Sequence, residues 1–170
     1  MCRGVASPRV QFIHGLEGSP QGAKAVLFDA HFTALTPAMD TSDFEASVGV
    51  QTEALARFRP DVLVGSSFGG GVAVALLERG TWRGPTLLLA QAAVYMNPEA
   101  RLPADVDVWL VHGLRDDLVA PQHSRQLAAT GDPARVRLIE LDDDHSLHGA
   151  TTSGELVQIV EDLFHATRGE

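Results

Sequence analysis

The chain has 170 residues, of which 45% are hydrophobic and 21% charged, and this length and apolar content suit one globular domain spanning residues 1–170. The formal net charge of −9 argues against a broad surface for nucleic acid or anionic lipid, since both need clustered lysine and arginine. The single cysteine, Cys2, excludes an intrachain disulfide.

Six short apolar runs bounded by turn residues predict strands, which in chain order lie within residues 9–15, 32–37, 61–67, 84–92, 105–113 and 135–141. Between most of them the apolar residues have helical spacing, which predicts helices at residues 20–31, 42–58, 68–80, 121–130 and 153–168. Ser42 or Asp43 is the predicted cap of the second helix, and Ser153, with Glu155 nearby, that of the last. Residues 92–104 leave little room for a helix and are predicted to form a loop.

The alternation of strands and helices predicts an α/β fold, a three-layer α/β/α sandwich whose sheet of about six strands is mainly parallel. In such a fold the catalytic and binding residues lie at the carboxyl ends of the strands. After the first, third, fifth and sixth strands come HGLEG (14–18), GSSFG (65–69), HGLRDD (112–117) and DDDH (142–145). Serine, carboxylate and histidine side chains are therefore expected at one edge of the sheet.

The segment GSSFG has the form Gly-x-Ser-x-Gly between a buried strand and a helix, which is the context of a nucleophile elbow. The elbow holds a nucleophile above the sheet on a strained turn, and Gly65 and Gly69 keep the positions two residues from Ser67 small. The free N–H groups at the start of the following helix favour the negative charge that forms during acyl transfer. Ser67 is the predicted nucleophile, and Ser66 is a small residue within the turn.

A phosphate-binding loop is the alternative for this turn, but the segment lacks both GxGxxG spacing and a Lys-Ser/Thr pair. A serine nucleophile needs a histidine base and a carboxylate that orients the base. The three residue types occur along the chain in the order serine, acid, histidine. Ser67 comes first, Asp116 or Asp117 second, and His145 or His148 third.

Four segments in order resemble the α/β-hydrolase superfamily, near the compact lidless serine esterases and dienelactone-hydrolase-like proteins, over nearly the whole chain. FIHGLEGSP (12–20) resembles the oxyanion loop, VGSSFGG (64–70) the nucleophile elbow, WLVHGLRDDLVAP (109–121) the HGxxDxxV motif of the acid, and LDDDHSL (141–147) the loop of the catalytic histidine. Within these motifs the acid falls on Asp116 and the base on His145. The resemblance further implies that the N–H groups of Leu16 and Phe68 form the oxyanion hole.

The acidic cluster at residues 142–145 also contains metal-ligand residue types, together with His148. Adjacent residues seldom converge on one ion, and no other His or Cys pair has ligand spacing, so we predict neither a metal nor a cofactor. His112 is interpreted as a hydrogen-bonded histidine at the end of a strand.

Fuller members of the superfamily insert a cap domain, and no cap is evident in this sequence. We therefore expect an open site, which suits small acyl substrates. Glu17, Tyr95 and Met96 are the predicted pocket residues. We expect a carboxylesterase-like serine hydrolase for small esters or thioesters; a peptidase or amidase and a non-catalytic binding protein are the alternatives.

Apolar strings such as TLLLAQAAV are too short to span a bilayer, and the N-terminal stretch lacks the long apolar core of a signal peptide. These features predict a cytoplasmic protein without a membrane partner. The motifs predict a small-molecule ester as the substrate, and the net charge argues against nucleic acid as a partner.

Overall fold

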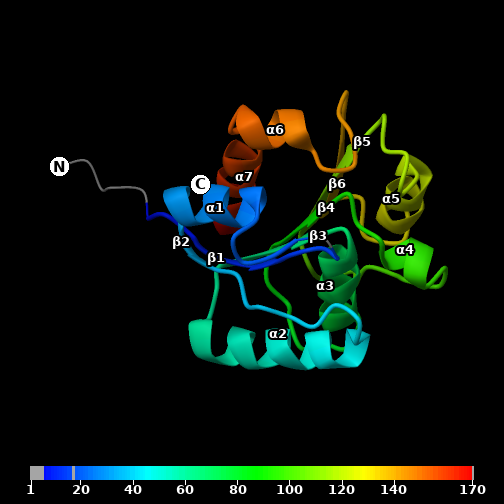
Figure 1. The fold of residues 1–170 in the computed structure, drawn as a ribbon. Helices are drawn as coiled ribbons and strands as arrows, with labels where there is room; N and C mark the ends of the chain where they lie inside the picture. Colours follow the sequence, from blue (N-terminus) through cyan, green and yellow to red (C-terminus); the bar gives the residue numbers. More distant parts are fainter. Residues whose placement is uncertain (1–5, 17, 170) are drawn as a thin grey trace.

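The computed structural model describes residues 6–16 and 18–169, so the predictions for Cys2 and Glu17 lie outside the described residues. Its strands form a six-stranded, parallel sheet in the order β2-β1-β3-β4-β5-β6 (Figure 1). The strands are β1 (Arg9–Ile13), β2 (Thr33–Leu35), β3 (Val62–Ser66), β4 (Thr86–Leu89), β5 (Val108–Gly113) and β6 (Val136–Leu141). Each lies inside a predicted stretch. Strands β3 and β4 are buried throughout, and a strand buried on both faces appears as a continuous apolar run.

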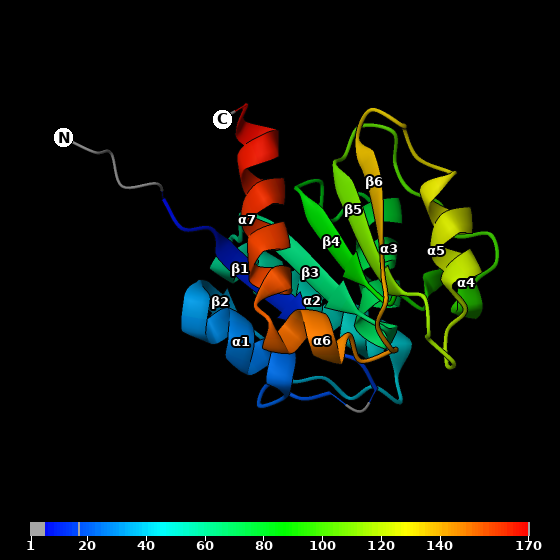
Figure 2. The ribbon, with the colours of Figure 1, turned by 90° about the horizontal axis from the view of Figure 1, so that it is seen from above.

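Apolar side chains cover both faces of the sheet, and helices pack on each. Ile13, Leu63 and Leu88 belong to the core with α2 (Phe44–Phe58), α3 (Phe68–Glu78), α4 (Ala93–Met96) and α5 (Pro121–Ala128). The opposite core contains α1 (Ala23–His31), α6 (His148–Thr152) and α7 (Glu155–Arg168), which lie together on the other side of the sheet in Figures 1 and 2. The structure is therefore the three-layer α/β/α sandwich that the sequence predicts. No helix in the described part of the chain has the length and apolar content that a membrane span requires.

Two short helices differ from the sequence prediction. Helix α4 forms in the stretch expected to be a loop, because Gln91 Oε1 accepts the N–H of Ala93 at 2.7 Å and starts the turn. Helix α6 follows the loop of His145, where the Asp143 carboxylate accepts the N–H of Ala150 at 2.9 Å. Both turns depend on buried polar side chains of the preceding loops, so the apolar periodicity did not reveal them.

The helix caps were predicted in part. Asp43 caps α2, since its side chain accepts the N–H of Ala46 at 2.9 Å, whereas the Ser42 hydroxyl donates to Asp40. The Ser153 prediction was wrong by one residue, because Gly154 occupies the N-cap of α7 with φ 80°. A positive φ of this kind favours glycine over any residue with a Cβ atom.

Candidate active site

Ser67 lies between β3 and α3 with φ 53° and ψ −116°. It is one of four non-glycine residues with positive φ in the described part of the chain, and such strained conformations cost about 1–3 kcal/mol. Hydrogen bonds hold the turn, because the N–H of Ser67 donates to the Leu89 carbonyl at 2.9 Å and its own carbonyl accepts from Ala92 at 3.0 Å. This turn holds the Ser67 side chain at the carboxyl edge of the sheet.

The two glycines of the elbow allow α3 to begin in contact with the sheet. A Cβ atom on Gly69 would lie 2.1 Å from the Ile13 carbonyl oxygen, and one on Gly65 would lie 2.5 Å from the Gly69 carbonyl oxygen. Because both obstructing atoms belong to the backbone, no side chain fits at either position. The Gly-x-Ser-x-Gly pattern is therefore required by the packing of α3 on β1 and β3.

Three side chains from separate loops form a hydrogen-bonded row. Ser67 Oγ lies 3.0 Å from His145 Nε2, and His145 Nδ1 lies 2.7 Å from Asp116 Oδ2. The carboxylate of Asp116 only accepts, so Nδ1 carries the proton and Nε2 is able to accept the proton of the serine hydroxyl. The Asp116 side chain is fully buried and that of His145 is 20% exposed, so the row runs from the interior to the surface.

The loop after β5 orients the carboxylate from its other side. Asp116 Oδ1 accepts the N–H groups of Leu118 at 2.9 Å and Val119 at 2.8 Å. Asp117 and His148, the second choices from the sequence, are exposed and lie outside the hydrogen-bonded row.

The two predicted oxyanion donors belong to the two segments that lie next to the nucleophile. Phe68 is the first residue of α3, so its N–H is one of those that have no acceptor within the helix. Leu16 follows Gly15, on which a Cβ atom would lie 3.2 Å from Ser67 Cβ and 3.9 Å from Ser67 Oγ. The loop after β1 therefore packs directly against the nucleophile, and buried His14 supports this loop with Nδ1 at 2.8 Å from the Gly15 carbonyl oxygen.

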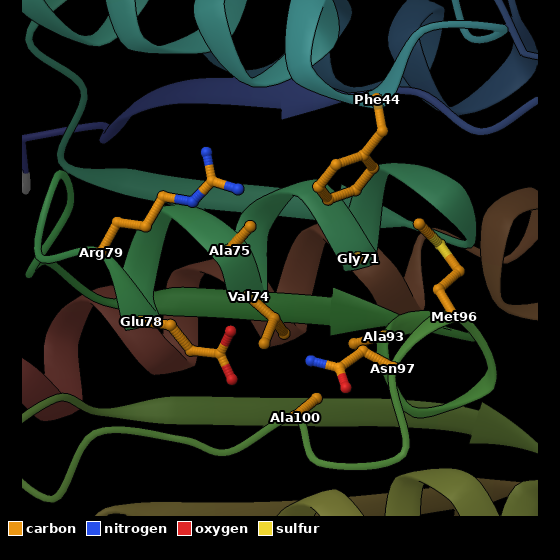
Figure 3. A pocket seen from close by; sticks show the side chains of 10 residues that line it. All are labelled: Phe44, Gly71, Val74, Ala75, Glu78, Arg79, Ala93, Met96, Asn97 and Ala100. Atoms are coloured by element: carbon orange, nitrogen blue, oxygen red, sulfur yellow. The ribbon is translucent and has the colours of Figure 1, made fainter.

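A cavity of about 320 Å³ adjoins the elbow between α2, α3 and α4 (Figure 3). At the end nearer to the elbow, Met96 packs toward Gly71, and the Phe44 ring meets the Phe68 ring edge-on at 5.8 Å. The other lining residues are Val74, Ala75, Glu78, Arg79, Ala93, Asn97 and Ala100.

Of the predicted pocket residues, Met96 lines this cavity and Tyr95 does not. The Tyr95 side chain is 68% exposed, and its ring lies 6.2 Å from that of His123. Glu17 lies outside the described residues. Phe44 was not predicted from the sequence, because this residue begins α2 and reaches the site only through the packing of α2 beside α3.

The loop that carries His145 is held by Asp143. Burial of this carboxylate opposes its ionisation, but the N–H groups of Ala150, Asp144 and Gly149 hold the pKa of Asp143 below its ordinary value of 3.8. From α1, Lys24 Nζ donates to the Ser146 carbonyl. Burial lowers the pKa of Lys24, although the Asp144 and Asp143 carboxylates act against this shift. Within the described residues, no group of three or more His, Cys, Asp or Glu side chains is placed to hold a metal ion.

Asp143→Asn is expected to lower the free energy of unfolding by about 1–3 kcal/mol near pH 7, because the substitution removes the negative charge and one acceptor oxygen. Since the folded-state pKa lies below that of the unfolded chain, the carboxylate's contribution is complete above the unfolded-state value of 3.8 and is lost as the pH falls through the folded-state value. Urea unfolding near pH 7 and at about pH 3 measures this difference, which should shrink in acid. Asp142→Asn is the control, since that side chain is 86% exposed. An equal loss of stability in the control would contradict the role of Asp143.

Comparison with known proteins finds this fold among hydrolases. No protein-family model and no curated protein sequence matches the chain. Among solved structures, mouse alpha/beta hydrolase domain-containing protein 10 matches with a TM-score of 0.75 at 18% identity, over 96% of this chain and 92% of its own. A monoacylglycerol lipase from Paleococcus ferrophilus matches with a TM-score of 0.70 at 14% identity, over 92% and 93%. A serine hydrolase without a lid from Xanthomonas campestris matches with a TM-score of 0.65 at 19% identity, over 98% and 84%.

These matches define the class of fold. The chain has the α/β-hydrolase fold in a small version, since its six described strands follow one another without an inserted cap domain.

Proposed function

We propose that this chain is a serine hydrolase that cleaves small carboxylic esters or thioesters through an acyl-enzyme. The observation that carries the proposal is the row from Ser67 Oγ to His145 Nε2 at 3.0 Å and from His145 Nδ1 to Asp116 Oδ2 at 2.7 Å. The fold supports it, because the solved structures that match include proteins described as lipases, esterases and serine hydrolases.

In the acylation step, His145 Nε2 takes the proton of Ser67 as Oγ bonds to the substrate carbonyl carbon. The N–H groups of Leu16 and Phe68 stabilise the oxyanion of the tetrahedral intermediate, at about 3 kcal/mol for each donor. The bond to the leaving oxygen or sulfur then breaks, and His145 returns its proton to the leaving group. Asp116 orients the imidazole and stabilises its charged form.

In the deacylation step, His145 Nε2 takes a proton from water while the water oxygen attacks the acyl carbon. The bond between Ser67 Oγ and the acyl group breaks, and the proton returns to Oγ. The partial exposure of His145 gives water a route to Nε2.

The cavity beside α3 is the proposed acyl site. Its lining includes Gly71, whose N–H donates to the Ser67 carbonyl at 3.2 Å, so the cavity begins about one helical turn from the nucleophile. Val74, Ala75 and Met96 supply the apolar part of its surface, and Glu78, Arg79 and Asn97 supply the polar part. Because a buried methylene contributes about 0.8 kcal/mol, kcat/KM for p-nitrophenyl esters should rise about 3- to 4-fold per added methylene until the cavity is filled.

Ala75→Leu is expected to end this rise at a shorter acyl chain, because the larger side chain occupies part of the cavity. A series of p-nitrophenyl esters of increasing chain length measures the shift. Ala46→Leu, at an exposed position of α2 outside the cavity, is the matched control and should keep the wild-type profile. If the two variants share the wild-type profile, the acyl chain binds elsewhere.

A fluorophosphonate probe tests the reaction class, because it forms a covalent bond with an activated serine. Folded wild-type protein should be labelled, and peptide mass spectrometry should locate the adduct on Ser67. Heat-denatured protein should remain unlabelled. Absence of labelling in the folded protein would overturn the proposal in favour of a non-catalytic binding protein.

A comparison of ester and anilide substrates distinguishes an esterase from a peptidase or amidase. An amide nitrogen leaves only after protonation, whereas a nitrophenolate leaves readily, so p-nitrophenyl esters should be cleaved much faster than the corresponding p-nitroanilides. Comparable rates for the two substrates would favour the amidase alternative.

A further inference from the structure

A second histidine lies behind the carboxylate of the proposed triad. His112, on β5, is fully buried, and its Nε2 lies 2.9 Å from the Val119 carbonyl oxygen and 3.0 Å from Asp116 Oδ2. Its Nδ1 lies 2.7 Å from Ser124 Oγ. The imidazole therefore bridges α5 and the loop that carries the triad acid.

The neighbours of His112 determine which ring nitrogen carries the proton. Gln91 Oε1 accepts the N–H of Ala93 at 2.7 Å, so the amide nitrogen of Gln91 is the group that donates to Ser124 Oγ at 3.1 Å. The Ser124 hydroxyl then donates its own proton to His112 Nδ1, which leaves the proton of the neutral ring on Nε2. Since the Val119 carbonyl and the Asp116 carboxylate are both acceptors, this tautomer satisfies every group in the chain of hydrogen bonds.

We infer that His112 is a positioning residue of the proposed hydrolase, whose Nε2–H holds the Asp116 carboxylate and the Val119 carbonyl in place. This inference rests on the proposed function, because Asp116 matters for catalysis only if His145 serves as the base.

The geometry of Val119 explains why His112 acts on the acid. Its N–H donates to Asp116 Oδ1 at 2.8 Å, and its carbonyl accepts from His112 Nε2. Nε2 also lies 3.0 Å from Oδ2, the oxygen that binds His145. Loss of the His112 donor removes the contact with Oδ2 and leaves the buried carbonyl of Val119, the residue whose N–H binds Oδ1, without this partner.

The test compares His112→Phe, which removes both ring nitrogens, with His112→Gln, whose side chain retains an N–H donor. His112→Phe should lower kcat for a p-nitrophenyl ester about 10- to 100-fold, the loss expected when a polar group that positions the charged acid is removed. KM should stay within about twofold, because His112 is fully buried and does not touch substrate. His112→Gln should recover most of kcat, and His31→Phe, at an exposed position of α1, should match the wild type.

Ser124 supplies a second, independent test. Ser124→Ala should lower kcat less than His112→Phe, because the tautomer of His112 loses its support while the ring remains. The double variant should be no slower than His112→Phe alone, since Ser124 acts on Asp116 through His112. In proton NMR, the low-field resonance of His145 Nδ1–H should shift in both single variants and stay unchanged in His31→Phe.

A kcat of His112→Phe equal to that of the wild type, or an equal loss in His112→Phe and His112→Gln, would overturn the inference. If His112→Phe does not fold, the inference is tested by the kcat values of His112→Gln and Ser124→Ala and by the resonance of His145 Nδ1–H. Failure of the proposed function has a different signature, because wild-type protein would then resist the fluorophosphonate probe and hydrolyse no ester.

Discussion

Ser67→Ala is expected to lower kcat for p-nitrophenyl esters by about 10⁵- to 10⁶-fold and to abolish fluorophosphonate labelling. Alanine lacks the oxygen that forms the acyl bond, while the backbone turn at this position stays compatible with a small side chain. Stopped assays at high protein concentration measure the residual rate, which the oxyanion donors alone would support.

Ser66→Ala is the matched control for the nucleophile. Ser66 is the last residue of β3 and is buried next to Ser67, so the two substitutions remove the same atom from adjacent positions. The control should stay within about threefold of the wild type and keep its labelling. His145→Ala should lose nearly as much activity as Ser67→Ala, and the double variant should lose no more, since the two side chains act as a unit. Full activity in Ser67→Ala would place the nucleophile elsewhere.

Gly69→Ala is expected to destabilise the fold by at least about 3 kcal/mol. The added Cβ atom would lie 2.1 Å from the Ile13 carbonyl oxygen and 2.6 Å from the His14 carbonyl oxygen. Both atoms belong to the backbone at the end of β1, so relief of the clash requires α3 to move away from the sheet. Urea unfolding measures the loss, and hydrolysis should fall with it because Ser67 and the oxyanion loop separate.

Gly49→Ala is the control for the glycine substitution. Gly49 lies within α2 and is exposed, and a Cβ atom added to it would meet no neighbouring element within 4 Å. Alanine there should raise the free energy of unfolding by about 0.5–1 kcal/mol, because it favours the helix over the unfolded chain. Wild-type stability in Gly69→Ala would show that α3 does not need such close packing at the elbow.

The strands and the elbow were predictable because their signals are local. Buried strands such as β3 and β4 are continuous apolar runs, and the turn at Ser67 needs small residues at fixed positions around it. The resemblance of residues 109–121 to the HGxxDxxV motif of the superfamily pointed to Asp116, which the structure places 2.7 Å from His145. Asp117 and His148 could not be set aside from composition alone, since they are chemically equal to the preferred residues.

The proposed acyl cavity and the short helices could not be predicted from local sequence patterns. Phe44 lines the cavity because α2 packs beside α3, and nothing in its own segment distinguishes it from an ordinary helix residue. Helices α4 and α6 are each started by a polar side chain, from Gln91 and from Asp143, rather than by apolar periodicity.

The sequence by itself determined the strands, the small residues of the elbow and the chain order of serine, acid and histidine, because each is a property of neighbouring residues. Only the tertiary structure decided which side chains meet. Ser67 and His145 are separated by 78 positions, and Gln91 and Ser124 by 33. His112 shows the difference most clearly: the sequence predicts a hydrogen-bonded histidine at a strand end, and the packing of α5 and the Asp116 loop around it determines what it binds.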